Sequence, residues 1–203
     1  MRRQLIPRRT RWYQARQDAK TPEEFTTSLT AGDTGTSDCA LSPTPGQLFF
    51  GHTEPMVSIR SARPDDAHAV SVLIDEAFAP YIDRIGTEPA PMHTDYPALI
   101  DTGAVWVAED EGQLVGTIVL TPGPDHLLLD NLAVPTLARG LGIGALLLDF
   151  AAEHGRALGV AELRLYTNAA MTENLAFYPR RGFVETHRST IDGFDRVFFS
   201  KQL

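Results

Sequence analysis

Residues 126–150 read HLLLDNLAVPTLARGLGIGALLLDF. The first part of this stretch is apolar except for Asp130 and Asn131, and it ends at Pro135. A short apolar run of this kind, closed by a proline, is typical of a buried strand rather than a helix. From Ile143 onward the apolar residues recur at helical spacing. The stretch therefore predicts a strand, a short loop and a helix in direct succession.

Three glycines alternate with apolar residues where this loop meets the helix, in the segment Arg139-Gly140-Leu141-Gly142-Ile143-Gly144. Because glycine has no Cβ atom, the backbone N–H groups at the start of a helix can close around an anion there. The helix dipole adds partial positive charge at that end, and Arg139 adds a full charge. The segment predicts a phosphate-binding turn. The alternative is that the glycines serve only an ordinary tight turn.

Two well-known phosphate-binding patterns do not fit this segment. The dinucleotide fingerprint requires Gly-x-Gly-x-x-Gly, whereas the third glycine comes one position too early here. The P-loop ends in Gly-Lys-Ser/Thr, whereas Gly144 is followed by Ala145. A nicotinamide dehydrogenase is also disfavoured because the chain shows no βαβ partner with a ribose-binding acid.

The flanking segments predict further strands and helices from their apolar periodicity and their turn residues. Strands are expected at residues 57–62, 104–108, 114–120, 126–134, 162–166, 184–190 and 196–200. Helices are expected at residues 65–78, 96–101, 143–159 and 169–178, the last capped by Asn168 or Thr172.

This order of elements resembles the GNAT superfamily of acetyltransferases, as do the glycine-rich loop and a second motif at residues 163–183. The resemblance covers residues 57–203. It implies an α/β (α+β) fold, with a mixed, mostly antiparallel central sheet flanked by helices. It also implies an N-acetyltransferase, which moves the acetyl group of acetyl-CoA by direct transfer to an amine of a small molecule or protein.

The resemblance also assigns residues to acetyl-CoA, the expected co-substrate; no metal is expected. In the family the glycine-rich loop holds the pyrophosphate, and the pantetheine arm lies along the central strand like an added strand. The family's usual asparagine falls on Met171 here, so Asn168 or Asn174 is expected to take over its hydrogen bond. The predicted cofactor-binding residues are Leu132, Ala133, Val134, Arg139, Gly140, Leu141, Gly142, Ile143, Gly144, Ala145, Asn168 and Asn174.

Acetyl transfer to an amine also needs a proton donor for the leaving thiolate and an acceptor for the amine proton. The tyrosine that often supplies the proton in the family maps onto Tyr178. Its phenol keeps the proton at neutral pH yet can pass it to a thiolate of slightly lower basicity. Pro179 disfavours helical geometry at Tyr178, so the sequence does not determine the direction in which the hydroxyl points. The alternative role of Tyr178 is packing.

Asp130 is the predicted catalytic base, because it interrupts the central strand near its middle. A water chain ending on its carboxylate could take the proton of the amine. Equally, Asp130 could satisfy backbone groups at a β-bulge. The sequence leaves both readings open.

Composition separates the first 55 residues from the rest of the chain. The first 20 residues carry seven Arg or Lys against a single Asp, and a stretch rich in Thr, Ser, Pro and Gly follows. Such a composition cannot bury enough surface to offset the entropy of ordering. Residues 1–55 are therefore predicted to be a disordered extension, and residues 56–203 to be the acetyltransferase domain.

Net charge and cysteine content restrict the expected partners and the expected compartment. The formal net charge of −8 argues against a nucleic-acid partner and mildly favours a cationic substrate such as an amine. The single cysteine, Cys39, excludes an internal disulfide and fits the reducing cytoplasm. No apolar run approaches membrane-spanning length, so no membrane partner is expected. We predict an enzyme; the alternative is a non-catalytic module that senses CoA thioesters. The acceptor amine and a homodimer stay open.

Overall fold

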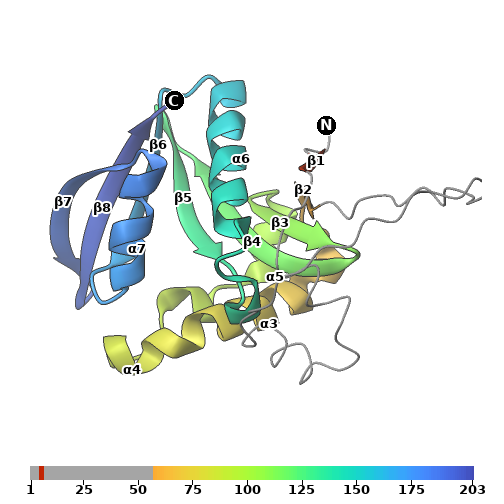
Figure 1. Ribbon diagram of the computed structural model, residues 1–203, viewed down its shortest axis with the longest axis horizontal. Helices are drawn as coiled ribbons and strands as arrows, with labels where there is room; N and C mark the ends of the chain where they lie inside the picture. Colours follow the sequence, from red (N-terminus) through yellow and green to blue (C-terminus); the bar gives the residue numbers. More distant parts are fainter. Residues whose placement is uncertain (1–4, 7–56) are drawn as a thin grey trace, which may run out of the picture.

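A mixed eight-stranded sheet runs through the computed structural model, which describes residues 5–6 and 57–203 (Figure 1). The strand order is β1-β2-β3-β4-β5-β6-β8-β7, and only the β5–β6 pair is parallel. The mixed, mostly antiparallel sheet is thus confirmed. Apart from residues 5–6, the predicted extension lies outside the described residues. The strands are β1 (Leu5–Ile6), β2 (Val57–Ser61), β3 (Val105–Asp110), β4 (Gln113–Pro122), β5 (His126–Ala133), β6 (Glu162–Asn168), β7 (Val184–Ile191) and β8 (Phe194–Gln202).

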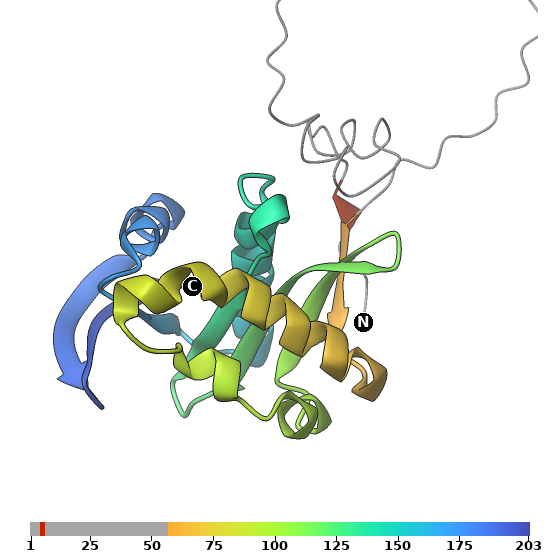
Figure 2. The ribbon, with the colours of Figure 1, turned by 90° about the horizontal axis from the view of Figure 1, so that it is seen from below.

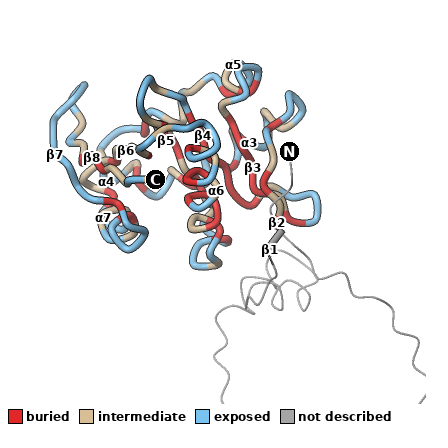
Figure 3. Tube along the Cα trace, turned by 90° about the horizontal axis from the view of Figure 1, so that it is seen from above, coloured by how far each residue is buried: buried red, intermediate tan, exposed pale blue. Residues whose placement is uncertain are grey.

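Helices cover both faces of the sheet (Figures 1 and 2). One cluster of buried side chains lies beneath α6 and a second lies beneath α3 and α5. Figure 3 shows buried residues along β3 and β4 and on the inner side of α6. None of the helices among the described residues is long and apolar enough to cross a membrane. The helices are α3 (Ala67–Phe78), α4 (Ile82–Ile85), α5 (Tyr96–Asp101), α6 (Ile143–Leu158) and α7 (Thr172–Phe177).

The sheet splits between its two parallel strands. Residues 126–129 of β5 pair with residues 162–165 of β6, and the pairing stops there. Beyond that point β5 stays with β4, whereas β6 stays with β8 as far as Asn168. The two strands diverge visibly in Figure 1. The split leaves backbone groups of β5 unpaired on the side that faces β6, which is where a ligand can add to the sheet.

A β-bulge on β5 marks the start of the split. Leu129 pairs with Leu120 of β4 and Asn131 pairs with Val119, so Asp130 between them has no partner. The extra residue reverses the faces to which successive side chains point. Buried residues before the bulge pack beneath α6, and Ala133 after it packs beneath α3 and α5. The bulge considered for Asp130 is therefore present.

Helix α7 begins later than the sequence predicts. It starts at Thr172 rather than at residue 169, and Met171 occupies its N-cap position. The prediction that Asn168 or Thr172 caps the helix is therefore wrong. The side-chain oxygen of Asn168 instead accepts a hydrogen bond from the backbone N–H of Ala170 at 2.9 Å. This local bond favours a turn over helix at that point, as short polar side chains commonly do.

The effect expected of Pro179 is also wrong. Tyr178 has helical angles, φ −65° and ψ −44°, and its N–H donates to the carbonyl of Asn174 at 3.1 Å. Pro179 opens a separate 3₁₀ turn, Pro179–Arg181. At the first position of such a turn the missing N–H of proline leaves no bond unmade. The ring of Tyr178 is therefore placed by α7.

We expect a chain that begins at Met56 to keep its fold. Leu5 and Ile6 pair only with Val57 and Ser58, so about two backbone hydrogen bonds of about 1 kcal/mol each would be lost. In a domain of this size such a loss lowers Tm by less than about 10 °C. Thermal unfolding of the full and shortened chains measures the difference. A larger fall would show that the extension contributes to the folded domain.

Candidate active site

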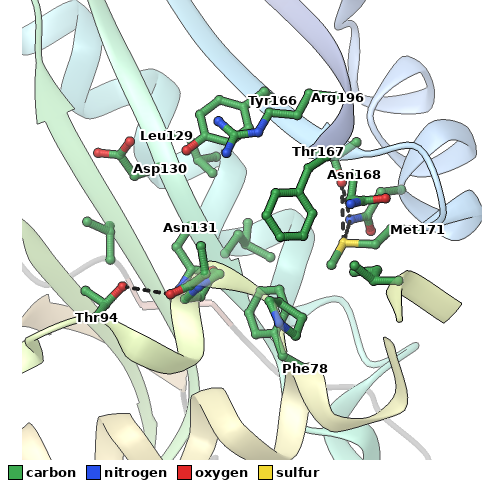
Figure 4. Close-up of a pocket in the computed structure, with 18 of the residues that line it drawn as sticks. Phe78, Thr94, Leu129, Asp130, Asn131, Tyr166, Thr167, Asn168, Met171 and Arg196 are labelled. Atoms are coloured by element: carbon green, nitrogen blue, oxygen red, sulfur yellow. Dashed lines mark hydrogen bonds between the residues drawn. The ribbon is translucent and has the colours of Figure 1, made fainter. Parts of the chain in front are cut away.

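A cavity of about 290 Å³ opens where β5 and β6 separate (Figure 4). Its wall is built from both halves of the sheet, from α7 and from the segment that leads to α5. Five of the residues predicted for the site meet there, whereas the glycine-rich loop is not part of its lining. The five residues are Asp130, Leu132, Asn168, Asn174 and Tyr178.

Tyr178 lies in the cavity wall with only 5% of its surface exposed. Its ring packs against Phe183 and Phe199, with centroids 5.6 and 5.7 Å apart. Among the described residues no group forms a hydrogen bond with its hydroxyl. Burial raises the pKa of Tyr178 above the ordinary value of a phenol. The side chain therefore presents a protonated hydroxyl that is not used by the fold.

Asp130 lies in the same wall, on the β5 side. One oxygen of its carboxylate accepts a hydrogen bond from the hydroxyl of Thr121 on β4. The carboxylate borders the cavity, so it can also reach a ligand or a water molecule there. The bulge and a catalytic role are compatible, because the bulge is what turns Asp130 into the split. Its role as base stays a prediction.

Asn131 is a site residue that the sequence analysis did not select. Its side chain is 7% exposed, and its Nδ2 donates to the hydroxyl of Tyr96 at 3.0 Å. That hydroxyl donates in turn to the carbonyl of Pro91, and burial raises the pKa of Tyr96 to about 12. The Oδ1 atom of Asn131 is buried without a partner among the described residues. The polar break at residues 130–131 of an apolar strand was the available signal.

The two candidate asparagines play different structural roles. Asn168 holds the turn before α7 through the N–H of Ala170. Asn174 donates through Nδ2 to the hydroxyl of Thr167 at 2.9 Å, and that hydroxyl donates to the sulfur of Met171 at 3.6 Å. The side-chain oxygen of Asn174 has no partner among the described residues. Asn174 is thus the better placed of the two to accept a hydrogen bond from a ligand.

The glycine-rich loop has the geometry of an anion site. Gly140 and Gly142 have φ of +78° and +85°, and a Cβ at either position would meet no atom within 4 Å. Gly142 is the N-cap of α6, and the first α6 amide bonded to a carbonyl is that of Leu146. The amides before it are left as donors, as at any helix start. The first turn contains no acidic residue, so the site fits a phosphate group.

At Gly144 the requirement for glycine comes from close packing. A Cβ there would lie 3.3 Å from the ring of Phe177, so a larger residue would require that ring to shift. Close packing at this position keeps the start of α6 beside the split. Leu141, Ile143 and Ala145 contribute their backbone to the loop, and Ile143 is also buried in the core.

Arg139 points away from the loop. Its Nη2 donates to the carbonyl of Ala77, near the end of α3, at 2.6 Å, and its Nε donates to the carbonyl of Val134 at 3.4 Å. Its guanidinium also lies over the ring of Tyr81, 5.6 Å from the centroid. The side chain therefore ties the loop to α3. Its predicted contact with a phosphate is not part of this arrangement and stays a prediction.

The three residues predicted to lie against the pantetheine arm lie at the end of β5 and just after it, and their contact with the cofactor stays a prediction. Leu132 and Ala133 form the end of β5, beyond the part that pairs with β6. The side chain of Leu132 borders the cavity. That of Ala133 packs in the cluster beneath α3 and α5, whereas that of Val134 packs against the cluster beneath α6. A free strand edge, an anion-binding helix start and an unpaired tyrosine hydroxyl thus surround one split.

The profile of the Acetyltransferase (GNAT) family matches residues 70–183, more than half of the chain. The chain belongs to this family. The chain is 29% identical over 119 residues to N-acetyltransferase 8 of Mus musculus, which is 55% of this chain and 52% of that protein. It is 36% identical over 87 residues to N-acetyltransferase family 8 member 3 of Rattus norvegicus, 40% of this chain and 38% of that one. The matches thus span about half of these relatives or less.

Solved structures share the fold along nearly their whole length. The PaiA N-acetyltransferase of Thermoplasma acidophilum, crystallised with coenzyme A, matches with a TM-score of 0.64 at 20% identity, over 72% of this chain and 99% of that one. The ribosomal-protein-alanine N-acetyltransferase of Brucella melitensis matches with a TM-score of 0.57 at 27% identity, over 71% and 99%. The expected GNAT fold is confirmed.

Proposed function

We propose that this protein is an N-acetyltransferase that moves the acetyl group of acetyl-CoA directly to an amine. The observation that carries the proposal is the hydroxyl of Tyr178, a residue of the cavity wall, which bonds to no described residue. A hydroxyl that the fold leaves without a partner is available to bond a ligand in the cavity. Family membership and the names of the relatives support the same reaction.

The residues around the split have separate roles in this reaction. The amine nitrogen attacks the thioester carbonyl carbon, so a C–N bond forms and the C–S bond then breaks. Asp130 takes the amine proton through a water molecule, and Tyr178 gives its proton to the departing thiolate. The free backbone of Leu132 and Ala133 lies where it can pair with the pantetheine amides and polarise the thioester oxygen. The products are an acetamide and the free thiol of CoA.

Release of CoA from acetyl-CoA in the presence of a panel of amines tests this proposal. We expect release that depends on both the amine and the protein. Tight binding of acetyl-CoA without release for any amine would favour the alternative, a sensor of CoA thioesters. The relatives are named as acetyltransferases, which favours the enzyme.

We expect Asp130→Asn to lower kcat/KM by about 100-fold near neutral pH, the lower end of the range for general-base help. The defect should shrink toward about pH 10, because an alkylamine then loses its proton in solution and needs no protein base. Initial rates of CoA release across this pH range measure the effect. Thr121→Val is the matched control, since it removes the hydrogen bond to Asp130 and keeps the carboxylate. An Asp130→Asn enzyme with wild-type rates at every pH would remove Asp130 as the base.

Several features remain predictions from the sequence alone. They are a domain spanning residues 56–203, a location in the cytoplasm, and the lack of a nucleic-acid, membrane or metal partner. Whether the chain forms a homodimer stays open.

A further inference from the structure

The cavity contains one positive charge that the proposed reaction does not use. Among the described residues that line it, Arg196 of β8 is the only Lys, Arg or His, and Asp130 is the only Asp or Glu. Antiparallel pairing places Arg196 opposite Asn168 of β6, next to the split. Only 19% of its side chain is exposed. A mostly buried guanidinium beside a cavity needs an acceptor for its N–H groups, either from the fold or from a ligand.

The fold leaves most of this guanidinium unmatched. Its carbon lies 4.7 Å from the centroid of the Tyr166 ring, which orients it by a cation–π contact. Its ionic partner is Asp192, 3.8 Å away and 80% exposed, so this ion pair is weak. No described residue accepts a hydrogen bond from the guanidinium. Arg196 therefore holds several N–H donors in a fixed orientation beside the cavity.

The opposite wall carries hydrogen-bond acceptors. Asp130 presents a carboxylate there, and the buried Oδ1 of Asn131 has no partner among the described residues. Both suit the N–H groups of an amine. Figure 4 shows Tyr166 between Asp130 and Arg196, with the guanidinium against its ring. The cavity thus has hydrogen-bond acceptors on β5 and a donor on β8.

We propose that the acceptor substrate carries a carboxylate as well as its amine, and that Arg196 binds the carboxylate. The proposal rests on the proposed function, since it names the substrate class of the same site. The amine lies near Asp130 and Asn131, where it meets the thioester, and the carboxylate pairs with the guanidinium. A planar guanidinium binds a carboxylate through two parallel hydrogen bonds.

This arrangement also disfavours acceptor amines that carry a second positive charge or no second charge at all. An acceptor with a second positive charge, such as a diamine, would bring that charge against Arg196. Like charges in a sheltered site repel each other, and the guanidinium cannot lose its proton to relieve the repulsion. A neutral alkylamine would leave the guanidinium without a partner. The carboxylate-bearing amine is the class that satisfies both ends.

The test compares matched acceptors that differ only in charge. CoA release is measured with 6-aminohexanoate and with its neutral amide, and with shorter ω-amino acids, for the wild type and for Arg196→Gln. We expect the wild type to prefer the carboxylate over the amide by about 10- to 100-fold in kcat/KM, mainly through KM. Arg196→Gln should lose that preference and leave the rate with the amide within about threefold. Arg196→Lys should keep part of it.

Arg188→Gln is the matched control, because it removes the same charge from β7, where Arg188 is 58% exposed and paired with Glu185 outside the cavity. It should keep the preference for the carboxylate. Equal kcat/KM for the acid and its amide in the wild type would overturn the proposal. So would an Arg196→Gln variant that loses both activities equally.

A failure of the proposed function is distinguishable from a failure of this inference. If no amine releases CoA, the binding of 6-aminohexanoate to the protein saturated with CoA is measured by calorimetry. Binding that is lost in Arg196→Gln, with an unchanged Tm, would uphold the carboxylate site. No binding to the wild type would overturn it.

Discussion

Tyr178→Phe is expected to lower kcat by about 10²- to 10⁴-fold, the range found for general-acid help. The substitution deletes only the hydroxyl and keeps the ring contacts with Phe183 and Phe199. Because the hydroxyl has no partner among the described residues, its removal should not lower the stability of the fold. Affinity for acetyl-CoA should barely change, since the phosphates and the pantetheine arm are held elsewhere. Steady-state rates, calorimetry and thermal unfolding measure the three quantities.

Tyr81→Phe is the matched control. Tyr81 is also buried, but it does not line the cavity, so the loss of its hydroxyl should leave kcat unchanged. A Tyr178→Phe enzyme within about threefold of the wild type would mean that the thiolate leaves unaided or through water. A weaker affinity for acetyl-CoA with normal kcat would instead make Tyr178 a binding residue.

The pH dependence of kcat provides a second check on Tyr178. Burial raises its pKa above 10, so the phenol keeps its proton at every pH below that value. If Tyr178 is the donor, kcat should not fall between about pH 8 and 10 through loss of its proton. A fall in that range that disappears in Tyr178→Phe would contradict the raised pKa.

Gly142→Val is expected to weaken the binding of acetyl-CoA by at least about tenfold, because a side chain there enters the space that the pyrophosphate needs. The position is open in the structure, since a Cβ would meet no atom within 4 Å. It lies beside the unpaired amides at the start of α6. Calorimetry with acetyl-CoA measures the loss.

The φ of +85° at Gly142 makes any larger residue there a source of strain, and the control must carry the same strain. Gly159, at the other end of α6, has φ of +75° and is equally open. Gly159→Val should therefore lower Tm to a similar extent and leave acetyl-CoA binding intact. Equal affinities in the two variants would remove the glycine-rich loop as the pyrophosphate site.

The local pattern of the sequence was sufficient to predict the order of most strands and helices. A short apolar run closed by a proline located β5, apolar alternation located β6, and helical spacing after Gly142 located α6. These predictions succeeded because strand and helix periods, and the residues that end them, act over a few neighbours. The start of α7 was predicted wrongly because a local side-chain hydrogen bond competes with the helix there. Asn168 binds the N–H of Ala170 and competes with the helix, which propensity alone did not reveal.

The candidate site was only partly predictable. Asp130 and Tyr178 were selected, the first as a polar break in an apolar strand and the second from a family motif. Asn131 was passed over although it belongs to the same break, because its importance comes from Tyr96, which is 35 residues away in the chain. Arg139 was expected at the phosphate and instead bonds to the carbonyl of Ala77, 62 residues away.

The sequence by itself determined the strand–loop–helix unit and the glycines at its turn, because each depends on backbone preferences of adjacent residues. The tertiary structure alone decided which side chains share the cavity. Arg196 reaches it because β8 pairs with β6, and Asp130 faces it because a bulge shifts the register of β5 against β4. Such pairings depend on contacts between distant segments, whose free energy is set by the packing of the whole sheet and leaves no local pattern.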